Sequence, residues 1–117
     1  MTDAWYSCMV RTVGLIDGIG KSSDQRSVFV FEAASWPEAQ RTAISLGRSL
    51  EKQYVNAAGQ RVRIALTDLV TLDELGFLES SGREVFAEID IVEEPDVTVS
   101  FDVEFHPEDS TPMQTGV

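Results

Sequence analysis

Two segments near the N-terminus have the apolar and β-branched residues that are typical of paired strands. Residues 5–15 end at a loop, residues 17–24, that is rich in Gly, Ser and Asp, and residues 25–34 follow it. The centre of the second segment, residues 27–32, is apolar on both faces, as in strands that are buried on both sides. We therefore expect a hairpin whose second strand lies inside the sheet.

A helix is predicted after this hairpin. Ser35 and Glu38 have the spacing of a capping box, in which the serine oxygen accepts from the amide three residues on. Pro37 is tolerated there because the first helical turn has no intrahelical amide bonds to lose. Apolar or small side chains then recur three and four residues apart on one face: Trp36, Ala39, Ala43, Leu46, Gly47, Leu50 and Tyr54. We expect that face to cover the sheet, and residues 56–59 to end the helix at Gly59, which can adopt a positive φ.

The next strand pattern contains one polar residue that does not fit. In residues 60–72 apolar and polar side chains alternate until Asp68, which falls on the apolar face. One extra residue in the strand near Thr67 would return Leu69 or Val70 to the core. The sequence therefore predicts a β-bulge or bend at this position.

Two more strands are predicted, at residues 84–92 and 97–105. In the second, Val and Phe alternate with polar residues without an exception, which is the most regular strand pattern in the chain. The order is ββαβββ and the fold class is α+β: a two-layer domain, residues 1–105, with one long helix on a mostly antiparallel sheet of four or five strands. Residues 106–117 lack apolar periodicity after Pro107, so we expect a flexible C-terminal tail.

The composition fits one small domain, because 117 residues, 43% of them hydrophobic, are enough to form a core. The formal net charge is −11 and is unevenly distributed. Residues 1–66 hold six acids and eight bases, whereas residues 67–117 hold fourteen acids and one base. A negative field repels phosphate backbones, so we expect no nucleic acid partner. The apolar stretch at residues 4–16 is interrupted by polar residues and resembles neither a signal peptide nor a membrane span, which predicts a cytoplasmic protein without membrane contact.

No residue pattern identifies a catalytic, cofactor or metal site. Residues 14–22 end in Gly-Lys-Ser like a phosphate-binding loop, but the glycine spacing is wrong and a strand pattern follows where a helix is needed. Cys8, the single cysteine, is expected to be a small buried hydrophobe, and His106, the single histidine, lies at a strand end where it is poorly anchored for catalysis. The strand arginines are expected to pair with glutamates of neighbouring strands, and an anion or partner site is the alternative: Arg11, Arg26, Arg61 and Arg63 with Glu32, Glu84 and Glu88.

Several short motifs follow one another along most of the chain. They are Trp-Tyr-Ser at residues 5–7, Phe-Glu-Ala at 31–33, Glu-Ala at 38–39, Asp-Leu at 68–69 and Gly-Arg-Glu-Val-Phe at 82–86. In this order they resemble domain of unknown function 4288, a small uncharacterised bacterial family, over about residues 4–92. The resemblance implies a ββαββ domain of unknown activity, to which this chain adds the pattern at 97–105 and the tail.

The acidic second half of the chain suggests a function in binding. If residues 84–92 and 97–105 lie side by side, their carboxylates form one negative surface that a basic protein partner would complement. The carboxylates of this predicted surface are Glu84, Glu88, Asp90, Asp102 and Glu104. We therefore predict a non-enzymatic protein-binding module, similar to immunity or antitoxin proteins. A metal-dependent hydrolase with clustered carboxylates and a structural homodimer built through the last strand are the alternatives.

Overall fold

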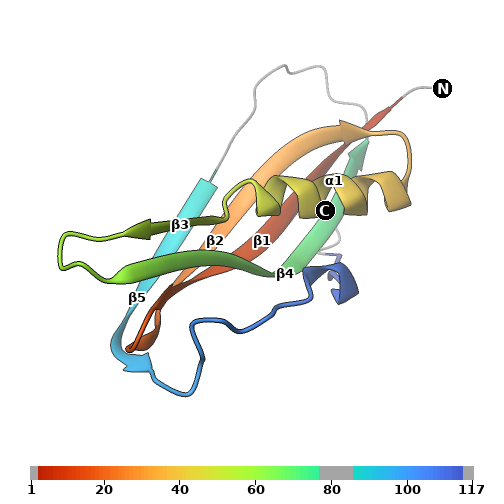
Figure 1. Cartoon of the computed structure of the whole chain (residues 1–117). Helices are drawn as coiled ribbons and strands as arrows, with labels where there is room; N and C mark the ends of the chain where they lie inside the picture. The colour runs from red at the N-terminus through yellow and green to blue at the C-terminus, as the bar shows by residue number, and fades with distance from the viewer. Residues whose placement is uncertain (1–2, 77–85, 115–117) are drawn as a thin grey trace.

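The computed structural model describes residues 3–76 and 86–114, and for residues 86–94 it describes the backbone alone. In the described part of the chain, one antiparallel five-stranded sheet carries one α-helix (Figure 1), which confirms the α+β fold class and the order ββαβββ. The elements are β1 (Ala4–Ile16), β2 (Gly20–Ala33), α1 (Trp36–Arg48), β3 (Lys52–Val55), β4 (Arg61–Gly76), β5 (Phe86–Asp96) and the 3₁₀ helix η1 (Pro107–Asp109). The strands lie in the order β3-β4-β1-β2-β5. No helix among the described residues is long and apolar enough to cross a membrane.

β1 and β2 form the predicted hairpin at the centre of the sheet. Their pairing continues over nearly the whole of both strands, and β2 lies between β1 and β5, so it is an interior strand as expected. The turn at residues 17–19 leads into Gly20, whose φ of 110° is accessible to glycine and rarely to other residues. A Cβ atom at Gly20 would also lie 2.2 Å from the backbone oxygen of Asp96. The hairpin therefore depends on glycine at this position.

The helix begins at the predicted cap, although the Glu38 carboxylate reaches the amide of Ala34 and not that of Ser35. The Ser35 Oγ accepts from the amide of Glu38 at 3.3 Å, and the Glu38 carboxylate accepts at 2.7 Å from the amide of Ala34. These contacts satisfy amides that have no partner inside the helix. The smallest side chains of the helix are the ones buried against the sheet: Ala39, Ala43 and Gly47. They allow the helix to approach the strands closely.

The main core lies between α1 and the sheet. Its larger buried side chains come from three strands: Tyr6, Cys8, Val10, Phe31, Leu66, Leu69 and Leu72. The Tyr6 ring stacks on Phe31 with the centroids 6.1 Å apart and meets Trp36 edge-on at 6.4 Å. Cys8 is buried among these residues, as expected for a cysteine that acts as a small apolar group.

The helix is shorter than its apolar period predicted. It ends at Arg48, and Tyr54, which we placed on the helical face, belongs to the edge strand β3. Residues 56–59 form the turn of the β3–β4 hairpin instead of a helix stop. The Asn56 Oδ1 accepts there from the amides two and four residues on, both at 3.0 Å. This turn and the pairing of β3 with β4 give residues 52–59 backbone hydrogen-bond partners outside the helix, so the helix does not continue through them. The helical period of the apolar residues does not reveal these partners.

β4 contains the predicted bulge. Arg11 of β1 is opposite Asp68 and Thr12 is opposite Leu66, which leaves Thr67 as the extra residue. Two more register shifts follow further along β4, opposite Met9–Val10 and opposite Trp5–Tyr6 of β1. Each extra residue reverses the alternation, so side chains three residues apart share the buried face: Leu66, Leu69 and Leu72.

Residues 97–105, which we predicted as a strand, form a loop over the sheet face opposite the helix. Their apolar side chains make a second core with β1: Val13, Leu15, Val99, Phe101, Val103 and Phe105. The backbone makes turns, and the carbonyl oxygens of Phe101 and Val103 accept from Arg63 at 3.0 and 2.6 Å instead of from a neighbouring strand. The strand prediction was wrong because period-two alternation also suits a loop whose alternate side chains cover a sheet.

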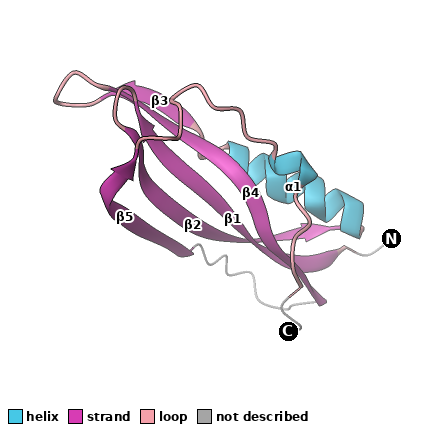
Figure 2. Cartoon of the chain, turned by 90° about the horizontal axis from the view of Figure 1, so that it is seen from below, coloured by secondary structure: helices cyan, strands magenta, loops and turns pink. Residues whose placement is uncertain are grey.

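The expected flexible tail also needs correction over residues 106–114. Pro107 is buried, and the Ser110 Oγ accepts from the amide of Leu69 at 3.0 Å. Met113 exchanges two backbone hydrogen bonds with β4, both 3.0 Å long. β3 pairs only with the first residues of β4, so the remaining edge of β4 has backbone groups to offer, and the C-terminal segment runs beside it to reach them (Figure 2).

Candidate functional site

The carboxylates of the predicted acidic surface do not share one structural element. Glu88 and Asp90 lie on β5, whereas Asp102 and Glu104 lie in the loop that covers the sheet face opposite the helix. Glu84 is outside the described residues. β5 pairs with β2 at one end of the sheet, whereas the loop carbonyls bind Arg63 of β4. The premise that two paired strands carry these acids side by side was therefore wrong.

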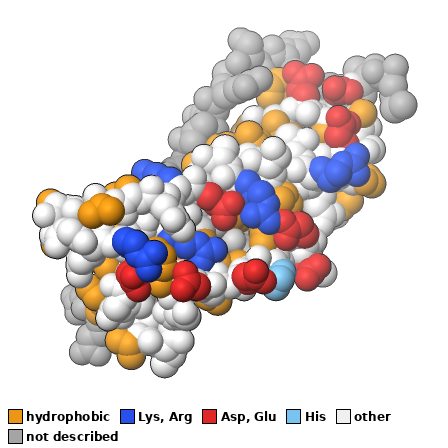
Figure 3. Space-filling model, in the orientation of Figure 1, with side chains coloured by type: hydrophobic (Ala, Val, Ile, Leu, Met, Phe, Trp, Pro, Cys, Tyr) orange, Lys and Arg blue, Asp and Glu red, His pale blue; other side chains and the backbone are white. Residues whose placement is uncertain are grey.

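Positive charge lies close to the loop acids. The Arg61 guanidinium lies 4.8 Å from the centroid of the Phe101 ring and pairs with Asp17 at 2.5 Å. The hydrogen bond to Asp17 raises the pKa of Arg61, and the charge of Asp102 adds a smaller effect in the same direction. The face seen in Figure 3 likewise shows Asp and Glu side chains interspersed with Lys and Arg. Around Asp102 the charges of both signs are mixed.

Arg11 forms the best-defined ion pair of the sheet. Its Nε and Nη2 atoms donate to the two carboxylate oxygens of Asp24 at 2.9 and 2.6 Å. The Lys21 Nζ lies 3.2 Å from the same carboxylate. The hydrogen bond from Arg11 is the largest influence on the pKa of Asp24 and lowers it, although burial acts in the opposite direction. Cross-strand pairing of this arginine is confirmed, but with an aspartate that lies diagonally across the hairpin instead of a glutamate.

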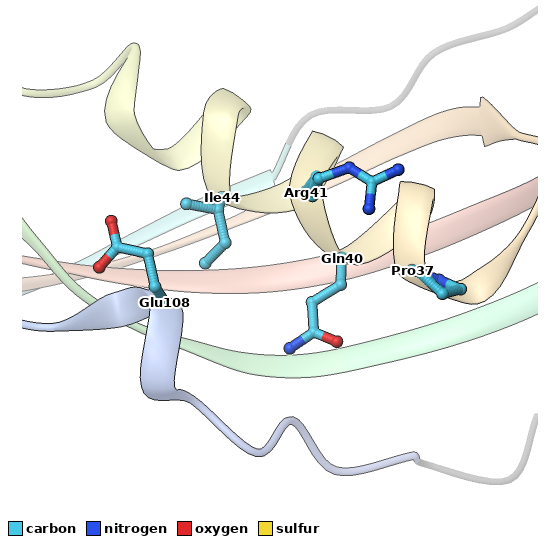
Figure 4. Close-up of a pocket in the computed structure, with 5 residues that line it drawn as sticks. All are labelled: Pro37, Gln40, Arg41, Ile44 and Glu108. Carbon is cyan, nitrogen blue, oxygen red and sulfur yellow. The ribbon is translucent and has the colours of Figure 1, made fainter.

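A hollow of about 360 Å³ lies between α1 and η1 (Figure 4), lined by Pro37, Gln40, Arg41, Ile44 and Glu108. Gln40 and Ile44 point toward η1, whereas Arg41 points away from it. The Gln40 side chain donates to the Ser110 carbonyl at 3.4 Å, and Arg48 pairs with Glu108. The polar groups here attach the C-terminal segment to the helix. We therefore interpret this hollow as part of the packing between these two segments and not as a binding site.

A second hollow, of about 300 Å³, is lined by residues of β1, β2, β3 and β4 and by Leu50, which follows α1. These strands extend past the end of α1 (Figure 1). This hollow, termed the polar pocket, is lined by Thr12, Ser23, Gln25, Leu50, Lys52, Tyr54 and Ile64. The strand register places Thr12 opposite Gln25 and Gly14 opposite Ser23. A Cβ atom at Gly14 would lie 2.2 Å from the Ser23 Oγ, so glycine is what allows the serine hydroxyl to occupy this position.

The sequence carried a signal for the polar pocket that we did not use. On the helix-side face of β2, apolar residues give way to polar ones toward its start: Phe31 and Phe29, then Ser27, Gln25 and Ser23. On the same face of β1, Tyr6, Cys8 and Val10 are followed by Thr12. We assigned residues 17–24 to a loop, which concealed the fact that Ser23 continues this face of β2.

The described residues include one thiol, and its environment keeps it protonated. Burial raises the pKa of Cys8 to about 12, so this cysteine is not an activated nucleophile. Among the residues that the structure describes, no group of three or more His, Cys, Asp or Glu side chains is placed to hold a metal ion. Comparison with protein family models, curated proteins and solved structures finds no match to this chain. The resemblance to the uncharacterised bacterial family stays a prediction.

Proposed function

We propose that the protein is a non-enzymatic binding module that recognises a basic protein segment through the outer edge of β5. β5 is the last strand of the sheet, and among the described residues no strand pairs with its outer side. Its 11 residues, Phe86–Asp96, include five carboxylates and no lysine or arginine. An acidic strand at the end of the sheet is the observation that carries the proposal.

The physical basis is strand addition. An edge strand offers amides and carbonyls to an incoming strand, and the side chains then decide which strand is accepted. A second copy of β5 would place carboxylates against carboxylates, which is destabilising. A strand with lysine or arginine at alternate positions would instead be attracted. Glu88 and Asp90 both belong to β5 and lie two positions apart along it.

A designed peptide tests the proposal directly. The probe is a strand-forming peptide of alternating lysine and valine, and its control has glutamate in place of lysine. We expect the lysine peptide to bind, to slow hydrogen exchange of the β5 amides, and to bind more weakly as sodium chloride is added. The glutamate peptide is expected not to bind.

Two matched double variants separate the β5 edge from the general acidity of the chain. Glu88→Gln with Asp90→Asn removes two charges from β5 and is expected to weaken binding roughly three- to tenfold. Asp102→Asn with Glu104→Gln removes two charges from the loop and should leave the affinity unchanged. Equal losses in both variants, or no binding of the lysine peptide at low salt, would contradict the proposal.

A further inference from the structure

The polar pocket contains a buried hydroxyl group without a partner. Thr12 is 1% exposed, and its Oγ1 is the one buried side-chain oxygen or nitrogen among the described residues that makes no hydrogen bond. Buried polar atoms in folded proteins nearly always have a partner, and one that lacks it needs a specific explanation. The Oγ1 is closed to solvent, so a molecule bound in the polar pocket supplies that partner when a neighbouring side chain of the lining, such as Gln25, moves aside.

Other polar groups converge on the same space. The Ser23 hydroxyl lies over Gly14, and no side-chain hydrogen bond engages it among the described residues. The Gln25 side chain donates to the Ser27 Oγ at 3.2 Å, which leaves its carbonyl oxygen and its second amide hydrogen available. Together with Thr12, these residues place two hydroxyls and one amide along two neighbouring strands.

The charge of the lining selects an anion. Lys52 is the one charged residue among those that line the pocket, and no carboxylate lies beside it there. Its ammonium lies 5.6 Å from the centroid of the Tyr54 ring, which is within cation–π range. One cation beside two hydroxyl donors suits a ligand with a single negative charge.

The remaining lining is apolar. Leu50 and Ile64 belong to the wall of the pocket and can contact hydrocarbon. The volume of about 300 Å³ is at the lower end of the range for small-molecule sites, which excludes large ligands. We propose that the polar pocket binds a small organic monocarboxylate. Its carboxylate would lie near Lys52 and the two hydroxyl groups, and its hydrocarbon part would contact Leu50 and Ile64. This site is separate from the proposed β5 edge, and its test is independent of that proposal.

The test is a titration followed by the amide resonances of the ¹⁵N-labelled protein. The probes are the straight-chain carboxylates from acetate to octanoate together with benzoate, each compared with its uncharged primary amide. We expect at least one carboxylate to shift the resonances around residues 12, 23 and 25 and to bind about tenfold more tightly than its amide, which lacks the charge. The proposal is overturned if no carboxylate shifts these resonances at millimolar concentration, or if each amide binds as well as its acid.

Three variants assign the effect to the pocket. Thr12→Val removes the hydroxyl with little change of shape, and we expect it to weaken binding about tenfold. Lys52→Gln should weaken binding similarly and abolish the preference for the acid over the amide. Ser45→Ala removes a hydroxyl from the exposed side of α1 and should change nothing. Wild-type affinity in Thr12→Val, measured on a sample whose spectrum shows the native fold, would overturn the assigned role of Thr12.

Discussion

Replacing Thr12 by valine exchanges a hydroxyl for a methyl group at a site that is closed to solvent. Where a buried threonine hydroxyl is bonded, this change is harmful because the partner is left without a hydrogen bond. Here the Oγ1 has no partner among the described residues, and the neighbouring core is apolar, with Val10 and Leu66 nearby in the sheet. We therefore expect the ligand-free protein to become more stable, although the same variant weakens the proposed binding.

The size of the gain follows from two terms. An unsatisfied buried polar group costs about 1–3 kcal/mol, and this cost disappears in the variant. One additional buried methyl group contributes about 0.8 kcal/mol, and the strain that the slightly different shape introduces subtracts up to about 1.5 kcal/mol. We expect the free energy of unfolding to rise by about 1–2 kcal/mol, which for a domain of this size corresponds to an increase in Tm of roughly 3–8 °C.

Urea denaturation, followed by the fluorescence of Trp5 and Trp36 and by circular dichroism, measures this change. Thr67→Val is the matched control, because the Thr67 hydroxyl lies 3.1 Å from the Arg11 carbonyl and 2.5 Å from Asp68 Oδ1 and is therefore bonded. The control should lose about 1 kcal/mol. If Thr12→Val loses stability as Thr67→Val does, the Thr12 hydroxyl is satisfied in the free protein, for example by an ordered water molecule, and the reasoning fails.

Three further outcomes follow from single residues. Gly47→Ala should lower the free energy of unfolding by about 1 kcal/mol, because a Cβ atom would lie 2.8 and 3.0 Å from the Leu66 methyl groups. This overpacking exceeds the gain in helix propensity. Urea denaturation measures the change, and an unchanged or higher midpoint would contradict it. Cys8, with a pKa near 12, should react with Ellman's reagent at pH 8 only after denaturation, so fast reaction of the folded protein would show that it is accessible. Asp24→Asn should destabilise the protein at neutral pH, where the carboxylate pairs with Arg11. Because the pKa of Asp24 is lowered below 3.8 in the folded state, the difference from wild type should shrink as the pH falls through that lowered pKa, and a constant difference in unfolding free energy down to pH 2 would argue against the pair.

The elements that the sequence predicted well are determined by residues that lie close to one another in the sequence. The capping contact between Ser35 and Glu38 spans three residues, and the bulge at Thr67 follows from one polar residue that breaks a local alternation. The β1–β2 hairpin joins two adjacent strands through a short turn. Local chemistry decides such features, so one sequence is enough to locate them.

The features that the sequence did not reveal depend on partners far away in the chain. The loop at residues 97–105 looks like a strand until β1 supplies a face for its apolar side chains and Arg63 supplies donors for its carbonyls. The end of α1 is set by the pairing of β3 with β4, and the polar pocket appears only when Thr12 and Ser23 are placed in register. Alternation says which side chains share a face, but it does not say what covers that face.

The two outer edges of the sheet are treated differently, and this difference bears on how the protein meets other chains. Past β3, the edge of β4 is covered by the chain itself, since the backbone of Met113 pairs with it. At the other end of the sheet, β5 has no described strand on its outer side and carries five carboxylates in 11 residues. Charge on an edge strand prevents pairing with an identical strand but not with one of opposite charge. A homodimer through β5 is therefore disfavoured by the same carboxylates that would attract a basic strand, so within the proposed function the charge of β5 both limits self-association and selects the partner.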